Sequence, residues 1–239
     1  MNYHNLDKEI LAQIKPPIWD PYYLLNNYLR KAYENVIPRL LKPDKKYTIL
    51  DYGCGIKPYY YLFEKNINNY IGIDIGDNPR ADQKIDVGEK LKFENNQFDF
   101  VLSSQVLEHV ENYEQYLEES YRVLKQNGYL LLSTHGTWQY HSSPYDFYRW
   151  TAYSLKRLIT KHHYEIIEFI PILGQLALTS QLRLTFYNSF ATMLGLVGKI
   201  ALIPISILYQ IKMKIEDSIT PNRVKERDSA IYLIVGQKV

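Results

Sequence analysis

Two acids that each close a short apolar run are the first residues suited to chemistry. Asp51 ends the run Tyr47–Asp51 and leads directly into the glycine-rich turn Gly53-Cys54-Gly55. Glycines let a backbone turn tightly and approach a ligand without obstruction by side chains. Asp74 ends the next run, and an acid about twenty residues beyond such a turn suits hydrogen bonding to ribose hydroxyls. This spacing indicates a site for a nucleotide-like ligand.

A second reactive segment follows a later apolar run. His135 and His141 are candidates for a general base, because an imidazole can exchange a proton near neutral pH. Tyr145, Asp146 and Arg149 are candidates for positioning a substrate. A second interpretation stays open for two of them: Asp146 and Arg149 pair to brace the loop, while the neighbouring aromatic side chains pack as a lid.

Four apolar runs are typical of buried strands and must position these residues. They span residues 47–51, 70–74, 98–103 and 129–133. We expect a helix over residues 58–65, with its proline in the first turn, and an amphipathic helix over 113–124. Strands that alternate with helices imply a parallel sheet built from right-handed crossovers. Ligands bind outside the carboxyl ends of such strands, so both reactive segments are expected at one edge of the sheet.

Several motifs then occur together, in the order and spacing of one family. They are Leu50-Asp51-x-Gly53-Cys54-Gly55, Gly72-Ile73-Asp74, Asp86-Val87, Phe98-Asp99-x-Val101, Val106-Leu107-Glu108-His109-Val110 and Arg122-Val123-Leu124-Lys125-x-x-Gly128. With these motifs, residues 47–135 resemble the class I S-adenosylmethionine-dependent methyltransferases, most closely the type 11 methyltransferase group. The resemblance implies that the cofactor is S-adenosyl-L-methionine and that the chain moves its methyl group to an acceptor.

The resemblance also implies a role for each matching position. The glycines of the turn would pass under the methionine part of the donor, and Asp51 would help to hold its amino group. Asp74 would bind the ribose, and Asp86 with Val87 would face the adenine. The implied donor-binding residues are Asp51, Gly53, Cys54, Gly55, Asp74, Ile75, Asp86, Val87, Ser103, Ser104 and Gln105, of which the last three would line the sulfonium end.

Two other functions use a similar sheet. A nicotinamide dehydrogenase needs a third glycine for close helix packing, and Pro58 stands at that position, which argues against this class. A protein that binds the methyl donor without transferring the methyl group stays open as the alternative. Cys54, the single cysteine, excludes a disulfide framework and a cysteine-rich zinc site. We predict no metal site, a packing role for Cys54 and a structural role for His109.

The acceptor is less well defined than the donor. Its predicted class is a small molecule, a glycan or a lipid-linked molecule, because the segment after residue 133 resembles the acceptor-side loop of relatives that modify sugars or envelope glycans. A net charge of +2 gives no field that would favour nucleic acid as a partner. Methyl transfer is an in-line displacement, so a base is needed only where the acceptor must lose a proton.

The pattern predicts an α/β fold: a doubly wound, Rossmann-like, mostly parallel seven-stranded sheet with helices on both faces. Further strands are expected over residues 164–170 and 230–236, with Thr151 as the N-cap of a helix. The predicted units are a helical cap over 1–44, a core over 45–170 and 229–239, and an apolar helical insertion over 171–228 before the last strand.

The insertion raises the question of a membrane. Phe190–Ile211 is long enough to span a bilayer and carries one formal charge, on Lys199. A last strand that returns to the sheet argues against a single span. Two interpretations stay open: helices packed on the fold or in a homodimer, or an element that lies in the bilayer surface. The expected location is cytoplasmic, with peripheral membrane association through residues 190–211 under the second interpretation.

Overall fold

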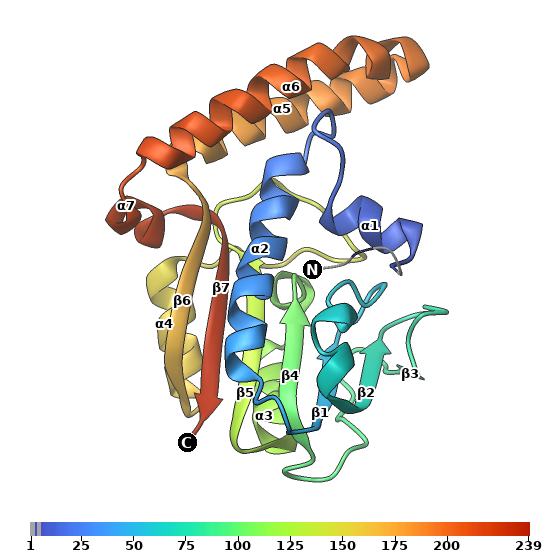
Figure 1. Ribbon diagram of the computed structural model, residues 1–239, viewed down its shortest axis with the longest axis vertical. Coiled ribbons are helices and arrows are strands. Elements are labelled where there is room, and N and C mark those ends of the chain that lie inside the picture. Colours follow the sequence, from blue (N-terminus) through green and yellow to red (C-terminus); the bar gives the residue numbers. More distant parts are fainter. Residues whose placement is uncertain (1–2, 4–5) are drawn as a thin grey trace.

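The computed structural model describes residue 3 and residues 6–239, which form a seven-stranded sheet with helices on both faces (Figure 1). Its strands are β1 (Tyr47–Tyr52), β2 (Ile67–Asp74), β3 (Gln83–Lys84), β4 (Phe98–Ser104), β5 (Leu124–His135), β6 (Tyr164–Gly174) and β7 (Ser229–Lys238). They lie in the order β3-β2-β1-β4-β5-β7-β6. The strands from β1 to β5 pair in parallel, and β7 is antiparallel to both of its neighbours. The predicted doubly wound, mostly parallel fold is confirmed.

The helices divide between the two faces of the sheet. They are α1 (Lys8–Ile14), α2 (Tyr23–Leu40), α3 (Tyr113–Val123), α4 (Ala152–Lys161), α5 (Gln175–Met193), α6 (Gly195–Ile219) and α7 (Asn222–Arg227), with short 3-10 helices η1 (Tyr60–Leu62), η2 (Glu64–Asn66) and η3 (Leu107–His109). One face is covered by α2 and η1, and the other by α3 and α4. Thr151 is the N-cap of α4, as predicted: its hydroxyl accepts a hydrogen bond from the backbone of Ser154.

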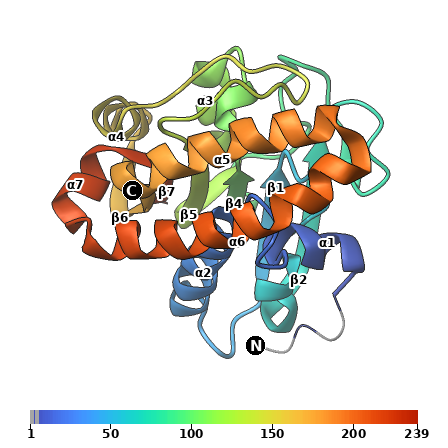
Figure 2. The ribbon, with the colours of Figure 1, turned by 90° about the horizontal axis from the view of Figure 1, so that it is seen from above.

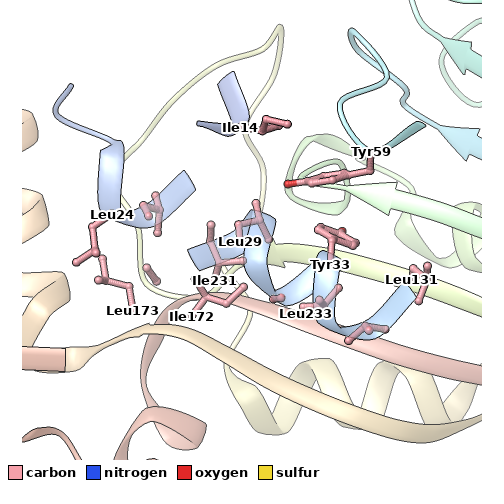
Figure 3. Close-up of a cluster of buried hydrophobic side chains, with 14 of the residues drawn as sticks. Ile14, Leu24, Leu29, Tyr33, Tyr59, Leu131, Ile172, Leu173, Ile231 and Leu233 are labelled. Carbon is pink, nitrogen blue, oxygen red and sulfur yellow. The ribbon is translucent and has the colours of Figure 1, made fainter. Parts of the chain in front are cut away.

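Two hydrophobic clusters hold these layers together, one on each side of the sheet, and Figure 3 shows part of the cluster on the α2 side. Successive side chains of a strand point to opposite faces, so β4 sends Phe100 and Leu102 toward α2 and sends Val101 toward α3. Tyr33 of α2 and Leu117 of α3 are fully buried against these faces. Burial of each such side chain contributes about 1.5–3 kcal/mol, so the sheet positions its loops rigidly.

The helix expected over residues 58–65 is absent. The segment instead forms η1 and η2, two short 3-10 turns. Lys57 has a φ of 56°, which is outside the helical region and prevents a regular first turn. The side chain of Asn66 then donates hydrogen bonds to the backbone carbonyls of Lys42 and Lys45, so the segment is tied to the chain that enters β1. A compact turn therefore replaces the longer helix.

Helices α5 and α6 form a hairpin that leaves the sheet at the end of β6 and returns through α7 to β7. The hairpin lies across the carboxyl edge of the sheet, over the start of α2 (Figures 1 and 2). Two buried glutamines fix it there, because Gln181 and Gln210 both donate hydrogen bonds to the carbonyl of Pro21. Within the described residues, α6 alone has the length and apolar composition of a membrane-spanning helix, with a mean hydropathy of 1.5.

Candidate functional site

Two adjoining cavities open at the carboxyl edge of the sheet. The larger has a volume of about 930 Å³ and extends from the turn after β1 to residues 85–89. The smaller, of about 470 Å³, extends from the same turn to the start of α2 and the loop after β5. Both are lined by Gly53, Gly55, Ser104, Gln105 and His141. A ligand in the larger cavity can therefore meet a second molecule in the smaller one.

The turn after β1 forms the shared wall. The backbone N–H groups of Gly53 and Cys54 both donate to the carbonyl of Ile73, at 2.9 and 3.0 Å, so the turn is held against β2. Gly53 has a φ of 81°, and a Cβ there would lie 2.6 Å from Cγ2 of Val106. Only glycine tolerates the positive φ and has no Cβ to clash with Val106, which explains why glycine occupies this position. The pKa of the Cys54 thiol is raised to about 12 by burial, consistent with the predicted packing role.

Asp74 lies at the end of β2 and borders the larger cavity. Its carboxylate accepts hydrogen bonds from the backbone of Ile75 at 2.9 Å, from the backbone of Gly55 at 3.0 Å and from the side chain of Asn78 at 2.7 Å. These contacts fix the carboxylate at the wall of the cavity. Val87 borders the same cavity and leaves 64% of its surface exposed, which offers a flat apolar contact.

Ten of the residues to which the resemblance gives a role in donor binding therefore border the two cavities. Those that border the larger cavity are Gly53, Gly55, Asp74, Ile75, Asp86, Val87, Ser104 and Gln105, and the smaller cavity adds Asp51 and Cys54. Ser103 is the exception. It is a fully buried residue of β4 that accepts a hydrogen bond from Tyr116 at 2.8 Å, and it borders neither cavity.

Asp51 is a buried carboxyl group in the wall of the smaller cavity. The hydroxyl of Tyr70 donates to it at 2.6 Å. Burial raises the pKa of Asp51 to about 7, although the hydrogen bond from Tyr70 and the charge of Lys57 act in the opposite direction. A cation bound beside Asp51 would lower this pKa and be held strongly in return.

Gln105 is held in an unusual conformation at the junction of the cavities. Its φ is 58°, and its side-chain amide donates to the hydroxyl of Ser133 at 3.0 Å. Its carbonyl oxygen Oε1 is buried and has no hydrogen-bond partner in the part of the chain that the structure describes. A strained backbone and an unpaired buried oxygen in a residue that lines a cavity are features of ligand sites.

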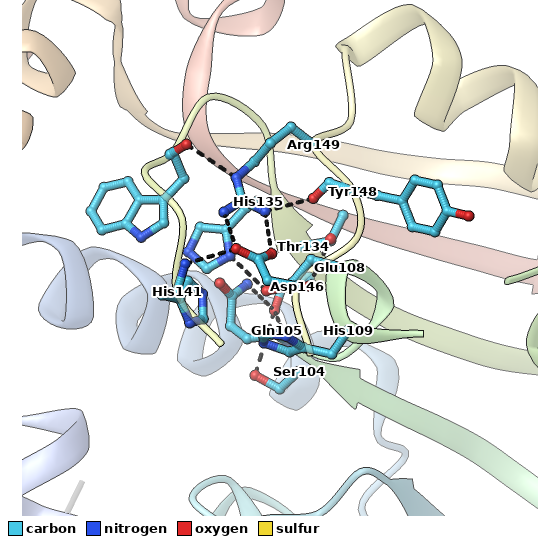
Figure 4. Close-up of polar contacts among 12 residues, drawn as sticks. Ser104, Gln105, Glu108, His109, Thr134, His135, His141, Asp146, Tyr148 and Arg149 are labelled. Atoms are coloured by element: carbon cyan, nitrogen blue, oxygen red, sulfur yellow. Dashed lines mark hydrogen bonds and ion pairs between the residues drawn. The ribbon is translucent and has the colours of Figure 1, made fainter. Parts of the chain in front are cut away.

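The most notable polar cluster joins η3 to the end of β5 (Figure 4). Glu108 is fully buried; it accepts a hydrogen bond from His135 Nδ1 at 2.6 Å and another from the Thr134 hydroxyl at 2.8 Å. Burial opposes ionisation, but the hydrogen bond from His135 and the charge of that ring lower the pKa of Glu108 below its ordinary value. The His135 ring lines the smaller cavity and stacks on Trp138, with ring centroids 5.3 Å apart.

His141 lies between the two cavities, edge-on to the rings of both His135 and His109. Burial, and then the charges of these two neighbours, lower the pKa of His141. Its Nε2 is buried without a partner among the described side chains. Ligand atoms of Glu108, His135 and His141 lie within 4.8 Å of one another, which makes them the group of described residues best placed to hold a metal ion.

Asp146 and Arg149 do not line either cavity. The carboxylate of Asp146 accepts two hydrogen bonds from Arg149 and one from the backbone of His141, while Arg149 also donates to the carbonyl of Trp138 (Figure 4). Burial opposes ionisation, yet these hydrogen bonds lower the pKa of Asp146 to about 2. The pair braces the loop, so of the three predicted substrate-positioning residues only Tyr145 borders a cavity.

Glu108 is the residue of this site that sequence reasoning missed. It was visible in the segment Val106–Val110, but only as part of a motif, and its partner His135 is 27 positions away. The order of the strands in the sheet was the signal that could have predicted this pair. Parallel strands β4 and β5 are neighbours, with Ser104 opposite Ser133, so the residues that follow them meet at the same edge.

Comparisons with known proteins point in one direction. Residues 25–170 match a family model described as a methyltransferase domain. An uncharacterized protein of Methanocaldococcus jannaschii is 35% identical over 116 residues, which are 46% of this chain and 51% of that protein. A ubiquinone biosynthesis O-methyltransferase of Pelagibacter ubique is 26% identical over 151 residues, 53% of this chain and 62% of that enzyme. The chain thus spans between about half and two thirds of the curated relatives it matches.

A solved structure covers nearly the whole chain. An S-adenosylmethionine-dependent methyltransferase of Archaeoglobus fulgidus superposes with a TM-score of 0.57 at 15% identity, covering 97% of this chain and 100% of that one. At this level of identity the likeness concerns the fold alone. It shows that the sheet order and the helices over both faces form a known architecture.

Proposed function

The chain belongs to the methyltransferase-domain family, as the match over residues 25–170 establishes, and from this premise we propose that its acceptor atom is a hydroxyl oxygen. It is an S-adenosylmethionine-dependent methyltransferase, which confirms the resemblance to class I enzymes drawn from its motifs. The observation that carries the choice of oxygen is the hydrogen bond between His135 and Glu108. A nitrogen acceptor that is already neutral needs no base, whereas a hydroxyl must lose its proton.

Residues of the larger cavity, together with Asp51 in the wall of the smaller one, fit the methyl donor. Gly53 borders the cavity without a side chain, and a Cβ there would clash with Val106. Asp51 suits the ammonium group of the donor, because a buried carboxyl with a raised pKa gains most from a neighbouring cation. Asp74 suits the ribose, and Gln105 and Ser104 line the cavity where the sulfonium end of the donor would lie. When bound, the donor supplies an already activated methyl group.

The histidine is arranged as a general base. Because Nδ1 of His135 donates to Glu108, Nε2 is the ring nitrogen that is left to accept a proton. The stack on Trp138 fixes the plane of the ring. As the acceptor oxygen attacks, its proton passes to Nε2, and Glu108 stabilises the imidazolium that forms. General-base catalysis of this kind contributes about a hundredfold to ten-thousandfold in rate.

The smaller cavity supports an acceptor with an apolar body and a hydroxyl end. Its walls include Leu25, Leu29, Trp138 and Ile231, and His135 also lines it. A volume of about 470 Å³ suits a small ring or the terminal part of a larger molecule. We therefore keep a small molecule, a glycan end or a lipid-linked molecule as the acceptor classes. The relative from Pelagibacter ubique is named an O-methyltransferase, which supports transfer to oxygen.

The experiment is to incubate the chain with a donor whose methyl carbon is isotopically labelled and with a panel of phenols, sugars and polyprenyl alcohols. The expected product carries the label in a methoxy group, which carbon NMR distinguishes from N-methyl and C-methyl groups. Label on nitrogen or carbon would refute the assignment of oxygen. The alternative function, donor binding without transfer, predicts donor affinity by calorimetry together with no labelled product on any acceptor.

A further inference from the structure

The α5–α6 hairpin exposes a large apolar surface at the end where α5 meets α6, which lies far from β6 and β7 in Figure 1. We define the hairpin tip as residues 186–203, where α5 ends and α6 begins. Its exposed apolar side chains are Phe186, Tyr187, Phe190, Met193, Leu194, Leu196, Val197, Ile200 and Ile203. Met193, Leu196 and Val197 leave 83%, 75% and 77% of their surfaces exposed. An exposed apolar patch of this size marks an interaction surface.

The apolar surface continues along the outer face of α6. Leu208, Ile211, Ile215 and Ile219 are exposed and lie three or four positions apart, so they form one stripe on the helix. The opposite face is buried against the fold, where Gln210 accepts a hydrogen bond from the backbone of Leu24 at 3.1 Å. Because the inner face of α6 is held against the fold, the outer stripe points away from the protein.

The charged side chains of the hairpin are all basic over most of its length. Residues 175–214 include Arg183, Lys199, Lys212 and Lys214 and contain no aspartate or glutamate. All four basic residues are exposed. The first acid after this stretch is Glu216, and it is engaged by Lys212 and by the hydroxyl of Ser180. Apolar side chains accompanied only by basic ones are typical of elements that lie in the surface of an anionic bilayer.

We propose that the tip and outer face of the α5–α6 hairpin dock on the surface of a bilayer that contains anionic phospholipids. The hairpin does not cross the membrane. Gly174, which precedes α5, pairs with Ser229, which begins β7, so both ends of the insertion lie side by side on the sheet. A hairpin that starts and ends at one place enters the bilayer surface and leaves it on the same side.

Docking in this way holds the smaller cavity close to the bilayer. Tyr22 and Leu25 line that cavity, and the neighbouring Pro21 and Leu24 contact Gln210 on the inner face of α6. The start of α2 therefore lines the cavity on one side and contacts the hairpin on the other. With the hairpin docked, the start of α2 and the hairpin lie between the cavity and the membrane surface.

The test is flotation of the full chain with two kinds of vesicle, phosphatidylcholine alone and phosphatidylcholine mixed with phosphatidylglycerol. The wild type is expected to float with the anionic vesicles and to be released by high salt. The triple variant Met193→Ser, Leu196→Ser, Val197→Ser should bind at least about tenfold more weakly, because it removes exposed apolar area. The pair Lys199→Ala, Lys214→Ala should weaken binding to the anionic vesicles alone.

Tyr153→Ser is the matched control, because Tyr153 is 76% exposed on α4, away from the hairpin. It should float like the wild type. All changed residues are exposed, so thermal melting should report an intact fold for every variant. Failure of the wild type to float with anionic vesicles, or equal flotation of the triple variant, would overturn the proposal. A wild-type dimer that the triple variant converts to a monomer, without vesicle binding, would instead assign the face to a second copy of the chain.

Discussion

His135 Nδ1 and Glu108 Oε1 are 2.6 Å apart in a buried pair at the carboxyl edge of the sheet. The pair is possible because β4 and β5 are parallel neighbours, so that η3, which follows β4, meets His135 at the end of β5. A carboxylate on one ring nitrogen leaves the other as the acceptor of a proton. This arrangement gives a methyltransferase the means to deprotonate a hydroxyl.

Replacement of Glu108 by Gln should lower kcat by about a hundredfold or more, because the amide cannot stabilise the imidazolium. Donor affinity should not change, since Glu108 does not line either cavity. Steady-state kinetics and calorimetry measure the two effects separately. A variant that loses donor affinity and keeps its kcat would show that Glu108 supports the donor site instead.

Donor binding should depend on pH through Asp51. Its pKa is raised to about 7, so its carboxyl becomes ionised as the pH rises through neutrality. Only the ionised form attracts the ammonium group, and we expect about tenfold tighter binding at pH 8 than at pH 6. Asp51→Asn should bind weakly with a flat profile. The same slope in that variant would assign the titration to another group.

A comparison of two glycines separates backbone strain from contact with the ligand site. Gly53 and Gly76 both have positive φ values, 81° and 67°, so alanine at either position should cost about 1–2 kcal/mol of stability. A Cβ at Gly53 meets Val106, whereas a Cβ at Gly76 meets open space. Calorimetry should therefore find donor affinity lost in Gly53→Ala and retained in Gly76→Ala. Equal affinities would show that the turn tolerates a side chain.

The Asp146–Arg149 pair should stabilise the loop over a defined pH range. The pKa of Asp146 is lowered to about 2, so its contribution is present above about pH 4 and is lost as the pH falls toward 2. Asp146→Asn should reduce the free energy of unfolding by about 1.5–3 kcal/mol at neutral pH, as measured by denaturant titration.

Asp77→Asn is the control for that measurement, because Asp77 forms a fully exposed ion pair with Lys84. Exposed pairs contribute little, so its unfolding curve should match that of the wild type. Identical curves for Asp146→Asn and Asp77→Asn would contradict a bracing role for Asp146.

The sequence was sufficient for the features that depend on local pattern. The apolar runs marked the strands, and Asp51, Gly53 and Asp74 marked the turn and strand ends that border the cavities, because a parallel sheet collects such residues at one edge. Thr151 marked the start of α4 for an equally local reason: its hydroxyl caps the helix next to it.

Features that depend on contacts between distant segments could not be predicted from the sequence. The partner of Glu108 is set by the neighbouring strands, and the burial of Ser103 depends on which face of β4 receives Tyr116. The pairing of Asp146 with Arg149 was only one of two open interpretations. The expected helix at residues 58–65 was wrong because the backbone of Lys57 and the hydrogen bonds of Asn66 impose tight turns.

The central claim is that His135 takes the proton of a hydroxyl acceptor, and the most direct measurement is the turnover of His135→Gln. His162→Gln provides the matched control, because His162 also pairs with a glutamate, Glu114, at 2.8 Å outside both cavities. With EDTA present throughout, the account predicts that His135→Gln keeps the donor affinity and loses about a hundredfold or more in kcat, while His162→Gln keeps both. Wild-type turnover in His135→Gln would contradict the account.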